Sequence, residues 1–480
     1  MIDARVNGAV PECDAATAAE IIEHGETILA GGFGSVGYPK AVPAALAELD
    51  RDLDLTVVSG GNVGPEIDVE CVGRGIVTRR FGYQNRDVST AAANDGSLAY
   101  HDRHLSRVGD EARTGFYGSP DVAIVEAIAV GEDWFVPTQS IGQVPSFVAA
   151  AEKLIIEVNE TVSPKFSAFH DVYLRELPPN RGEIPLEDPS GRIGSSRVHF
   201  DPEKLSAVVR TDRRDTPYEF RTPTDSDRAI AANFLEFLRA EADRNPALSS
   251  RIALQFGVGS LGNSLMEALD SDLLSDRELV YFGEVIQDGL LDALDSGAVS
   301  TASGSSLALS AEGTERLLED VDRYADRVVL RNSDVSNNAG LIDRFGVVSI
   351  NTGVDVDIYG HANVTHINGT RLVSGIGGGA DFTRASLLGI VVLSSTTSDG
   401  EISRIKPMVP HVDYTEHDLS VVITEQGVAD LRGLSPRERA TEIVESCAHP
   451  KYRPALRSYL DRATEKGGHV PHDFDSAFSW

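Results

Sequence analysis

Residues 251–269 read RIALQFGVGSLGNSLMEAL, and this stretch decides the expected fold. Its first six residues are mostly apolar, which is typical of a buried strand, and the glycine turn GVGSLG (257–262) separates them from a helical pattern. A strand, a glycine turn and a helix in this order form the repeating unit of α/β proteins. Further apolar runs at 54–61, 121–130, 153–159, 278–284, 327–332, 346–352 and 389–396 are predicted strands. Strands this apolar indicate parallel sheets covered on both faces, so the fold class is α/β with open, mostly parallel sheets.

The chain has 480 residues, which is too long for one ordinary core and suits two α/β domains. Between about residues 176 and 226 the pattern weakens into proline-rich, charged sequence interrupted by one short strand, KLSAVVRT. The helical segment RAIAANFLEFLRAEAD follows directly. We therefore predict an N-terminal domain over 1–225 and a C-terminal domain over 226–480. Other predicted helices include GYPKAVPAALAEL (37–49), PSFVAAAEKL (145–154), ERLLEDVDRYAD and PRERATEIVESCA.

Acidic residues dominate the charge: 74 Asp and Glu against 43 Lys and Arg give a net charge of −31. Only seven of the basic residues are Lys. An acidic excess spread along the whole chain suggests a surface adapted to high salt, a halophilic character. Such a surface repels nucleic acid and anionic membranes, so neither is an expected partner.

No apolar run is long enough for a membrane-spanning helix, and the N-terminus lacks a charged-then-apolar signal pattern. A cytoplasmic location is therefore expected. Cys13, Cys71 and Cys447 are widely spaced and form no CxxC motif, so neither a disulfide framework nor a zinc site is implied. Each is expected to be a small buried hydrophobe.

GVGSLG matches the GxGxxG pattern, and a dinucleotide-binding protein would place an acidic residue about 20 residues later, at the end of the next strand. Glu284, in YFGEVIQDG (281–289), occupies that place. The residue is therefore open to two interpretations, a ribose ligand or a catalytic group. A third interpretation of the turn itself is structural, because its glycines permit a tight backbone path.

A second glycine loop, SGIGGGADFTRASL (374–387), opens a predicted helix. Its backbone N–H groups could hold a phosphate or a developing oxyanion, or the loop could be a plain turn. FGSVG and VGSLG lack the first glycine of GxSxG, and His101, His104, His361 and His366 have no HExxH context. Serine, thiol and zinc chemistry are thus disfavoured, and a carboxylate nucleophile remains. A Glu anion among apolar walls could form an acyl anhydride, which is useful when an acyl group exchanges its thioester partner.

GEVIQDGLLDAL (283–294) resembles the catalytic segment of the acetyl-CoA hydrolase/transferase family, which includes CoA-transferases that exchange succinate, acetate and propionate. The resemblance extends along the chain through GGFGSVGYPKAVP (31–43), 135–159, 191–212, GVGSLGNS, SGIGGGADFTRAS, 411–440 and HPKYRP (449–454). It implies two open, mostly parallel-sheet α/β domains of the CoA-transferase type. The glycine turn is thereby reassigned from a dinucleotide to CoA.

The resemblance also implies roles for individual residues. Glu284 matches the glutamate that forms the anhydride and then a glutamyl-CoA thioester, and Asn337 in VSNNAGLIDR matches a donor to the thioester oxygen. Glu425 in ITEQGVADLRG matches a supporting acid, and Gly378 matches part of the oxyanion loop. The expected CoA contacts are Val258, Gly259, Ser260, Leu261, Gly262, Ser374, Gly378 and Ser398. Ser398 stands where the family's basic contact falls, and Arg404 or Lys406 would have to replace that charge.

The expected activity is a ping-pong acyl-CoA:carboxylate CoA-transferase acting on acetyl-, propionyl- or succinyl-CoA with acetate or succinate. The alternatives are an acyl-CoA hydrolase that uses the same Glu284 and, more remotely, a dinucleotide-binding protein. CoA and acyl-CoA are expected as substrates with short-chain carboxylates, and neither a metal nor a permanently bound cofactor is expected. The resemblance favours a homodimer.

Overall fold

The computed structural model describes residues 4–269, 274, 276–397 and 399–478. The chain divides into two compact, interleaved units. The first comprises 1–219, 282–288 and 301–341, and the second comprises 220–281, 289–300 and 342–480. The division predicted at residue 225 lies close to residue 219, where the chain first leaves the first unit. The prediction did not include the assignment of 282–288 and 301–341 to the first unit. The two-domain division stays a prediction, and each unit is described by itself.

The first unit contains a sheet whose main strands run in the order β10-β7-β5-β1-β2-β3-β4, and its neighbouring strands pair in parallel. Strand β6 lies off this order and pairs with β5 and β9 in antiparallel fashion. The bounds are β1 (Thr27–Ala30), β2 (Leu55–Val58), β3 (Val77–Phe81), β4 (Ala99–His101), β5 (Val122–Val130), β6 (Trp134–Pro137), β7 (Lys153–Asn159), β9 (Val198–His199) and β10 (Leu205–Thr211). This arrangement confirms the predicted α/β class.

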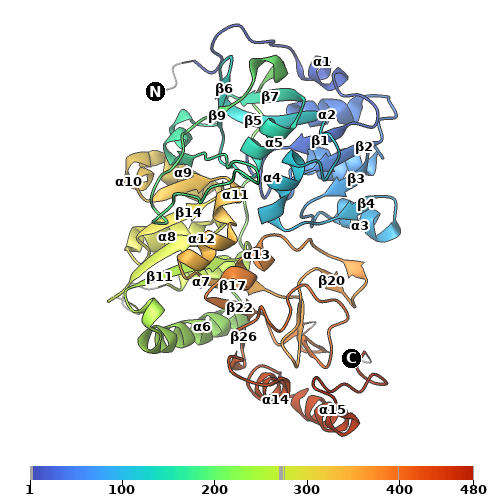
Figure 1. The fold of residues 1–480 in the computed structure, drawn as a ribbon, viewed down its shortest axis with the longest axis vertical. Coiled ribbons are helices and arrows are strands. Elements are labelled where there is room, and N and C mark those ends of the chain that lie inside the picture. The colour runs from blue at the N-terminus through green and yellow to red at the C-terminus, as the bar shows by residue number, and fades with distance from the viewer. Residues whose placement is uncertain (1–3, 270–273, 275, 398, 479–480) are drawn as a thin grey trace. The chain divides into compact units, whose positions relative to one another are not determined.

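Helices cover both faces of this sheet, which explains its apolar strands. Every residue of β5 is buried. Helices α1 and α2, at the upper right of Figure 1, pack together, and they share one apolar cluster with Ile28 of β1. Helix α5 packs against β1 and β5, where Val144 approaches Gly31 closely. The helices of this unit are α1 (Ala15–Glu20), α2 (Ala41–Glu48), α3 (Asp87–Asp95), α4 (Leu105–Arg113), α5 (Val144–Ala150), α9 (Ala311–Glu319), α10 (Val321–Ala325), α11 (Ser333–Ser336) and α12 (Ala339–Arg344), which runs into the second unit; short turns are η1 (Glu66–Cys71), η2 (Pro164–Phe169) and η3 (Pro202–Lys204).

The first unit holds further strands that build the surroundings of Glu284. Strands β14, β16 and β8 pair in parallel, and β13 pairs in parallel with β15. Their bounds are β8 (His170–Asp171), β13 (Val285–Ile286), β14 (Thr301–Gly304), β15 (Ser306–Leu307) and β16 (Val328–Arg331). The backbone of residues 139–142 bonds to Leu307, Ser305 and Ser333, which ties these strands to the sheet of β1–β5.

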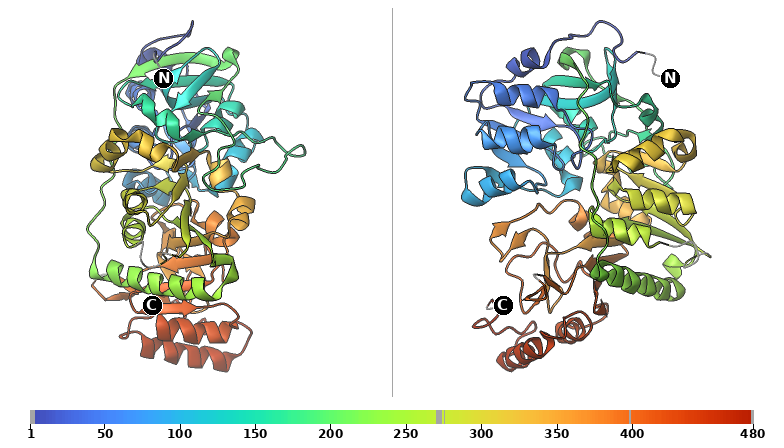
Figure 2. Two further views of the ribbon diagram at one scale, coloured as in Figure 1. Left: turned by 90° about the vertical axis from the view of Figure 1, so that its left-hand side faces the viewer. Right: turned by 180° about the vertical axis from the view of Figure 1, so that it is seen from behind.

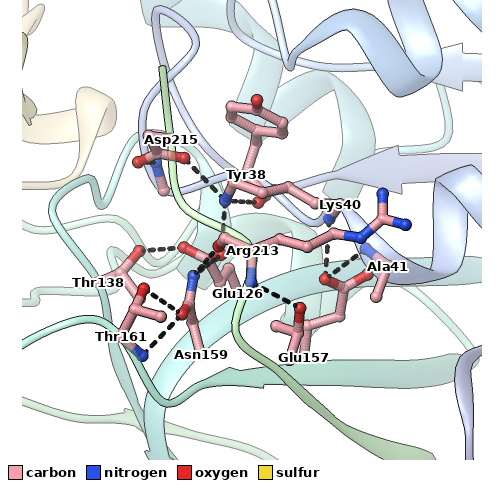
Figure 3. A network of polar contacts seen from close by, with 12 residues as sticks. Tyr38, Lys40, Ala41, Glu126, Thr138, Glu157, Asn159, Thr161, Arg213 and Asp215 are labelled. Carbon is pink, nitrogen blue, oxygen red and sulfur yellow. Dashed lines mark hydrogen bonds and ion pairs between the residues drawn. The ribbon is translucent and has the colours of Figure 1, made fainter. Parts of the chain in front are cut away.

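A buried polar network stabilises the same unit (Figure 3). Lys40, 1% exposed, places its Nζ 2.6 Å from Glu126 Oε1 and 2.7 Å from Asp215 Oδ1. Asn159 donates to Glu126 at 2.8 Å and to the carbonyl of Arg213 at 2.6 Å. The network therefore fastens the segment after β10 to the sheet. Burial lowers the pKa of Lys40, but the attraction of the two carboxylates outweighs it and holds that pKa above its usual value.

A second carboxylate in this region caps α2. Glu157 of β7 accepts backbone N–H bonds of 2.7–2.9 Å from residues 40, 41 and 42. These are N–H groups at the start of a helix, which have no partner within the helix. Burial raises the pKa of Glu157, and the three backbone bonds lower it.

In the second unit the strands run in the order β27-β26-β22-β17-β11-β12, parallel except for β27. Their bounds are β11 (Arg251–Phe256), β12 (Glu278–Phe282, whose last residue falls in the first unit), β17 (Val348–Thr352), β22 (Leu388–Val392), β26 (Val421–Thr424) and β27 (Gly427–Asp430). Small strands add three sheets: β18 (Asp355–Asp357) with β19 (Ala362–Asn363) and β25 (Ile405–Lys406); β20 (His366–Ile367) with β21 (Arg371–Leu372); and β23 (Thr396–Thr397) with β24 (Ile402–Ser403).

Helices complete the second unit. The long α6 packs along β26 and β27, and α14 lies side by side with α15 in both views of Figure 2. Their bounds are α6 (Asp225–Arg244), η4 (Pro246–Leu248), α7 (Ser260–Glu267), α8 (Asp288–Ser296, whose first residue falls in the first unit), α13 (Gly379–Ala385), α14 (Pro436–Ser446) and α15 (Arg453–Lys466). None of the described helices has the length and apolar character needed to cross a bilayer.

One expected helix is two helices in the structure. ERLLEDVDRYAD divides into α9 and α10 because Asp320 leaves the helical backbone, at φ −133° and ψ 62°. Its side chain accepts the backbone N–H of Arg323 at 3.3 Å and so caps α10. An Asp at this place favours capping over helix continuation, which a periodic apolar pattern does not reveal.

Candidate active site

Glu284 lies in a tightly bonded turn between β12 and β13. The N–H of Gly283 donates to Ser303 O at 3.0 Å. The carbonyl of Glu284 accepts the N–H groups of Ser305 and Ser306 at 2.5 and 3.2 Å. The residue is 7% exposed. Backbone hydrogen bonds at Gly283 and Glu284 therefore fix the main chain of the nucleophile candidate at the end of the apolar strand β12. The sequence predicts this place for Glu284.

Asn337 contacts the Glu284 carboxylate directly. It follows helix α11, is fully buried, and its Nδ2 donates a hydrogen bond to Glu284 Oε1. The N–H of Asn337 donates to Ser333 O at 3.0 Å, which fixes the backbone from which the amide extends. The structure therefore brings together two of the predicted site residues that lie 53 positions apart in the chain.

A buried guanidinium supports the strand beside Glu284. Arg331, at the end of β16, is fully buried and ion-paired with Asp171. Its Nε donates to Ser303 Oγ at 2.8 Å, and Ser303 O is the acceptor of the Gly283 N–H. Burial lowers the pKa of Arg331 to about 10, against the charge of Asp171, which raises it.

Within the first unit, Tyr83 lies near Glu284, and Tyr218 packs on the apolar cluster that contains Val285. Burial raises the pKa of Tyr83, the Asn85 amide that donates to its hydroxyl at 3.2 Å lowers it, and the charge of Glu284 raises it further. Burial likewise raises the pKa of Tyr218 to about 12, and the hydroxyl of Tyr218 donates to Gly34 O. Val285, next to Glu284, shares a small apolar cluster with Tyr218 and residues of the 31–36 loop. Tyr83 therefore interacts with the charge of Glu284, and apolar side chains pack around the neighbouring Val285.

The predicted CoA turn lies in the second unit, between β11 and α7. Gly259 has φ +124°, a conformation that glycine adopts readily, and Val258 is 41% exposed. Ser260 begins α7, and its Oγ accepts the N–H of Arg221 at 3.2 Å. Leu261 is half-buried and Gly262 is buried. The turn therefore exposes the apolar side chain of Val258, and among the described residues no atom beyond the chain neighbours lies within 4 Å of a Cβ built at Gly259.

The second glycine loop lies in the same unit. Gly377 has φ +58°, and the buried Gly378 is the N-cap of the short helix α13. Ser374 is half-buried and donates to Val364 O at 3.0 Å. A Cβ at Gly379 would overlap the Tyr414 hydroxyl, so this position accepts no larger residue without a shift.

Glu425 follows β26 in the second unit and holds a neighbouring loop. Its carboxylate accepts the N–H of Ser395 at 2.7 Å, the Ser395 hydroxyl, and the amide of Gln426 at 2.9 Å. Burial raises the pKa of Glu425, but these hydrogen bonds outweigh it and place the pKa below its usual value. The carboxylate is therefore ionised near neutral pH and organises the segment after β22.

Ser398 lies outside the described residues. The two basic residues considered as substitutes for its charge have other partners in the structure. Arg404 donates to Val354 O at 2.6 Å and to Gly353 O, and Lys406 Nζ lies 2.7 Å from Asp355 Oδ2. Both side chains therefore hold the strands around β18.

Sequence reasoning missed Ser305, Ser336 and Tyr83, although each has a local signal. Ser336 directly precedes Asn337, Ser305 follows strand β14, and Tyr83 follows strand β3 in the first sheet. Polar residues just beyond the carboxyl ends of parallel strands are candidates for a site in any α/β protein. The chain has many such residues, and only the fold selects these three.

The sequence matches two family models. Residues 12–210 match the acetyl-CoA hydrolase/transferase N-terminal domain, and residues 313–460 match the C-terminal domain of that family. The chain is 38% identical over 469 residues to the succinyl-CoA:acetate CoA-transferase of Clostridium kluyveri, covering 96% of this chain and 87% of that protein. It is 37% identical over 471 residues to the propanoyl-CoA:succinate CoA transferase of Escherichia coli, covering 96% and 95%. It is also 38% identical over 483 residues to an acetyl-CoA hydrolase of Candida glabrata, covering 96% and 91%.

Solved structures share the fold. RipA from Yersinia pestis matches with a TM-score of 0.72 at 21% identity, covering 95% of this chain and 98% of that chain. A 4-hydroxybutyrate CoA-transferase from Porphyromonas gingivalis matches with a TM-score of 0.62 at 20% identity, covering 95% and 97%. These matches confirm the expected CoA-transferase type of fold. The chain belongs to the acetyl-CoA hydrolase/transferase family and is therefore an enzyme, either a CoA-transferase or an acetyl-CoA hydrolase.

Proposed function

We propose that this protein is an acyl-CoA:carboxylate CoA-transferase in which Glu284 is the nucleophile. One observation carries the proposal: a buried glutamate, at the end of an apolar strand, accepts a hydrogen bond from the buried amide of Asn337. A desolvated carboxylate with a fixed donor beside it suits attack on a thioester carbonyl. The proposed substrates are acetyl-, propionyl- or succinyl-CoA with acetate or succinate.

In the first half-reaction a Glu284 oxygen attacks the thioester carbonyl carbon, the C–S bond breaks, and CoA leaves as the thiolate. The product on the enzyme is an acyl-glutamyl anhydride. The thiolate then attacks the glutamyl carbonyl, and the donor carboxylate leaves. The enzyme now carries a glutamyl-CoA thioester, so the energy of the original thioester is retained.

In the second half-reaction an acceptor carboxylate attacks the glutamyl-CoA thioester and expels the thiolate, which forms a second anhydride. The thiolate attacks the acceptor's acyl carbon, and this step releases the new acyl-CoA and the Glu284 carboxylate. Asn337 stabilises the negative oxygen that develops at each attack. From the resemblance, the backbone of Gly378 is proposed as an oxyanion donor. Each donor of this type contributes about 3 kcal/mol.

We also propose roles for the remaining predicted residues. Val258 to Gly262 and Ser374 contact CoA, and Glu425 supports the loop that it bonds through Ser395. Ser398 is proposed as a CoA-facing position without the basic side chain. The enzyme is proposed to be a cytoplasmic homodimer with a salt-adapted surface, which sedimentation at several salt concentrations would test.

Hydrolysis through the same intermediate is the second candidate, because the chain is as similar to an acetyl-CoA hydrolase as to a succinyl-CoA:acetate CoA-transferase. The test mixes acetyl-CoA with enzyme, with and without succinate, and follows free CoA and succinyl-CoA. A transferase forms succinyl-CoA only when succinate is present and releases little free CoA. Release of CoA at the same rate without succinate would refute the transferase proposal and favour the hydrolase.

Glu284→Ala tests the nucleophile itself and should abolish turnover without lowering stability. A matched control is Glu278→Gln, since Glu278 is an exposed acid at the start of β12 that pairs with Arg251. Borohydride treatment of enzyme with acyl-CoA, followed by peptide mass spectrometry, should show reduction confined to the peptide that bears Glu284. Normal transfer by Glu284→Ala, or reduction on another peptide, would contradict the assignment.

A further inference from the structure

A row of buried serine hydroxyls leads to the amide of Asn337. Ser336 Oγ lies 2.8 Å from Asn337 Oδ1, and Ser305 Oγ lies 2.7 Å from Ser336 Oγ. Ser333 Oγ is 3.5 Å from Ser305 Oγ, at the long limit for a hydrogen bond. All four residues are fully buried. The row ends at the Asn337 Nδ2 that donates to Glu284.

We propose that Ser336, itself held by Ser305, is a positioning residue that fixes the orientation of the Asn337 amide, so that its N–H side and not its oxygen faces Glu284. This inference rests on the proposed function, in which Glu284 is the nucleophile. Ser336 acts through Asn337 and does not touch the reacting atoms.

The direction of each hydrogen bond follows from the donors and acceptors available. An ionised carboxylate only accepts, so the group that Asn337 presents to Glu284 must be the Nδ2 amide. Oδ1 then faces Ser336 and can only accept, so the Ser336 hydroxyl donates to it. That hydroxyl has one proton, so Ser336 accepts from Ser305. The row therefore runs in one direction, from Ser305 through Ser336 and Asn337 to the carboxylate.

Such an arrangement leaves the amide one good orientation. A flipped Asn337 would place its oxygen against the carboxylate oxygen, and the Ser336 hydroxyl proton would lose the amide oxygen that accepts it. Both changes are unfavourable in a buried site, where polar atoms without partners carry a full desolvation penalty. Hydrogen bonds that point the same way also polarise one another, which strengthens the final donor to Glu284.

Ser305 also holds the backbone of the nucleophile. The N–H of Ser305 donates to the carbonyl of Glu284 at 2.5 Å, while its side chain bonds to Ser336. Gly304, the preceding residue, lies close enough to the Glu284 carbonyl that a Cβ there would be 3.0 Å from its oxygen. Ser305, between β14 and β15, thus fixes both the nucleophile and, through Ser336, the donor that faces it.

The test is a double-mutant cycle on kcat with Ser336→Ala, Asn337→Ala and the double variant, measured with acetyl-CoA and succinate. Ser336→Ala should lower kcat roughly tenfold, the equivalent of one lost buried hydrogen bond, and leave KM for acetyl-CoA unchanged. Asn337→Ala should lower kcat about 100-fold. In the Asn337→Ala background, Ser336→Ala should have no further effect, because the amide that it orients is gone.

Ser349→Ala is the matched control: Ser349 is also fully buried and also pairs with a serine, its Oγ lying 3.0 Å from Ser386 Oγ, but it has no bond to Asn337 in the described structure. It should keep the wild-type kcat. If Ser336→Ala does not fold, Ser305→Ala replaces it in the same cycle, with a smaller fall in kcat expected.

The outcomes separate two failures. Wild-type kcat in Ser336→Ala, or an equal fall with and without Asn337, would overturn the role of Ser336 while Glu284→Ala remains inactive. Full transfer activity in Glu284→Ala would instead overturn the proposed function. A Ser336→Ala variant that raises KM and keeps kcat would also contradict the inference, because a positioning effect on the nucleophile's partner must appear in the chemical step.

Discussion

Replacing Lys40 with Met should destabilise the protein strongly, because it removes the ammonium group that pairs with Glu126 in the network of Figure 3. The side chains of Lys40 and Glu126 are 1% and 0% exposed. Met has similar length and fills the same space. The change in stability of Lys40→Met therefore reports mainly the loss of the ammonium group and not a loss of side-chain packing.

The magnitude follows from the geometry. At the 2.6 Å between Lys40 Nζ and Glu126 Oε1, an effective dielectric constant of about 20 gives an attraction of about 6 kcal/mol. Asp215 Oδ1, at 2.7 Å, adds a second attraction of similar size. Desolvation of the buried ammonium offsets several kcal/mol of this total, so we expect Lys40→Met to lower the free energy of unfolding by about 3–5 kcal/mol.

The second arm removes the stranded charge. Lys40→Met with Glu126→Gln should recover at least half of the lost stability, because no ionised Glu126 then remains buried without its counter-ion. Urea unfolding at pH 8 and constant salt, with the midpoint and the m value both recorded, measures each variant. Lys451→Met is the control: Lys451 pairs with Glu401 on the exposed surface, and its loss should leave the midpoint unchanged.

The reasoning would be refuted by a loss below about 1 kcal/mol in Lys40→Met, the range of an exposed ion pair. The reasoning would also fail if Lys40→Met with Glu126→Gln were no more stable than Lys40→Met alone, because the loss of stability would then come from altered packing. An unchanged midpoint with a changed m value would point instead to the denatured state.

The pH dependence of the same network has a definite sign. Burial raises the pKa of Glu126 above its ordinary value of 4.5, against the Lys40 ammonium, which lowers it. At pH values between 4.5 and the raised pKa, the folded protein therefore holds a proton that the unfolded chain has released. Stability should fall as pH rises through this window and level off above it. Glu126→Gln should remove that slope, and an unchanged slope would exclude Glu126 as its source.

Two further predictions concern the second unit. Burial lowers the pKa of His361, but Asp357 and Glu416, 3.1 and 2.8 Å from its ring nitrogens, outweigh burial and raise the pKa above 6.5. The protonated His361 therefore stabilises the folded protein below pH 6.5, and this contribution is lost as pH rises through the raised pKa. His361→Gln should flatten thermal stability across that range, and a parallel pH profile would contradict this. Thr224 caps α6 by accepting the N–H of Asp227 at 3.2 Å, so Thr224→Ala should lower the free energy of unfolding by about 1 kcal/mol, whereas no shift in the urea midpoint would refute the cap.

Several elements could be predicted because their signals are local. Strand β5 was predicted from the apolar run at 121–130, and α6 from its amphipathic sequence; both lie within a residue or two of the expected bounds, except that α6 also includes its capped first turn. Helix α5 is shorter than predicted, since Lys153 and Leu154 belong to β7. A periodic pattern of apolar residues indicates that one face of an element is buried. It does not show at which residue a helix ends and the following strand begins.

The site divides in the same way. Glu284 was a candidate because a carboxylate at the end of an apolar strand is visible in the sequence, and the resemblance selected its role. Asn337 came from the resemblance alone. Ser305 and Ser336 were missed, since a serine is as common in plain turns as in sites, and its importance depends on which buried acceptor it faces.

By itself the sequence determined the α/β class, the strand-turn-helix units and the net negative charge, because periodicity, glycine turns and charged residues are visible in short stretches of chain. Only the tertiary structure decided which buried polar groups meet: Glu284 with Asn337, and Lys40 with both Glu126 and Asp215. A buried donor must find an acceptor, but sequence alone does not say which one, since sheet order and register bring the partners together across distant parts of the chain.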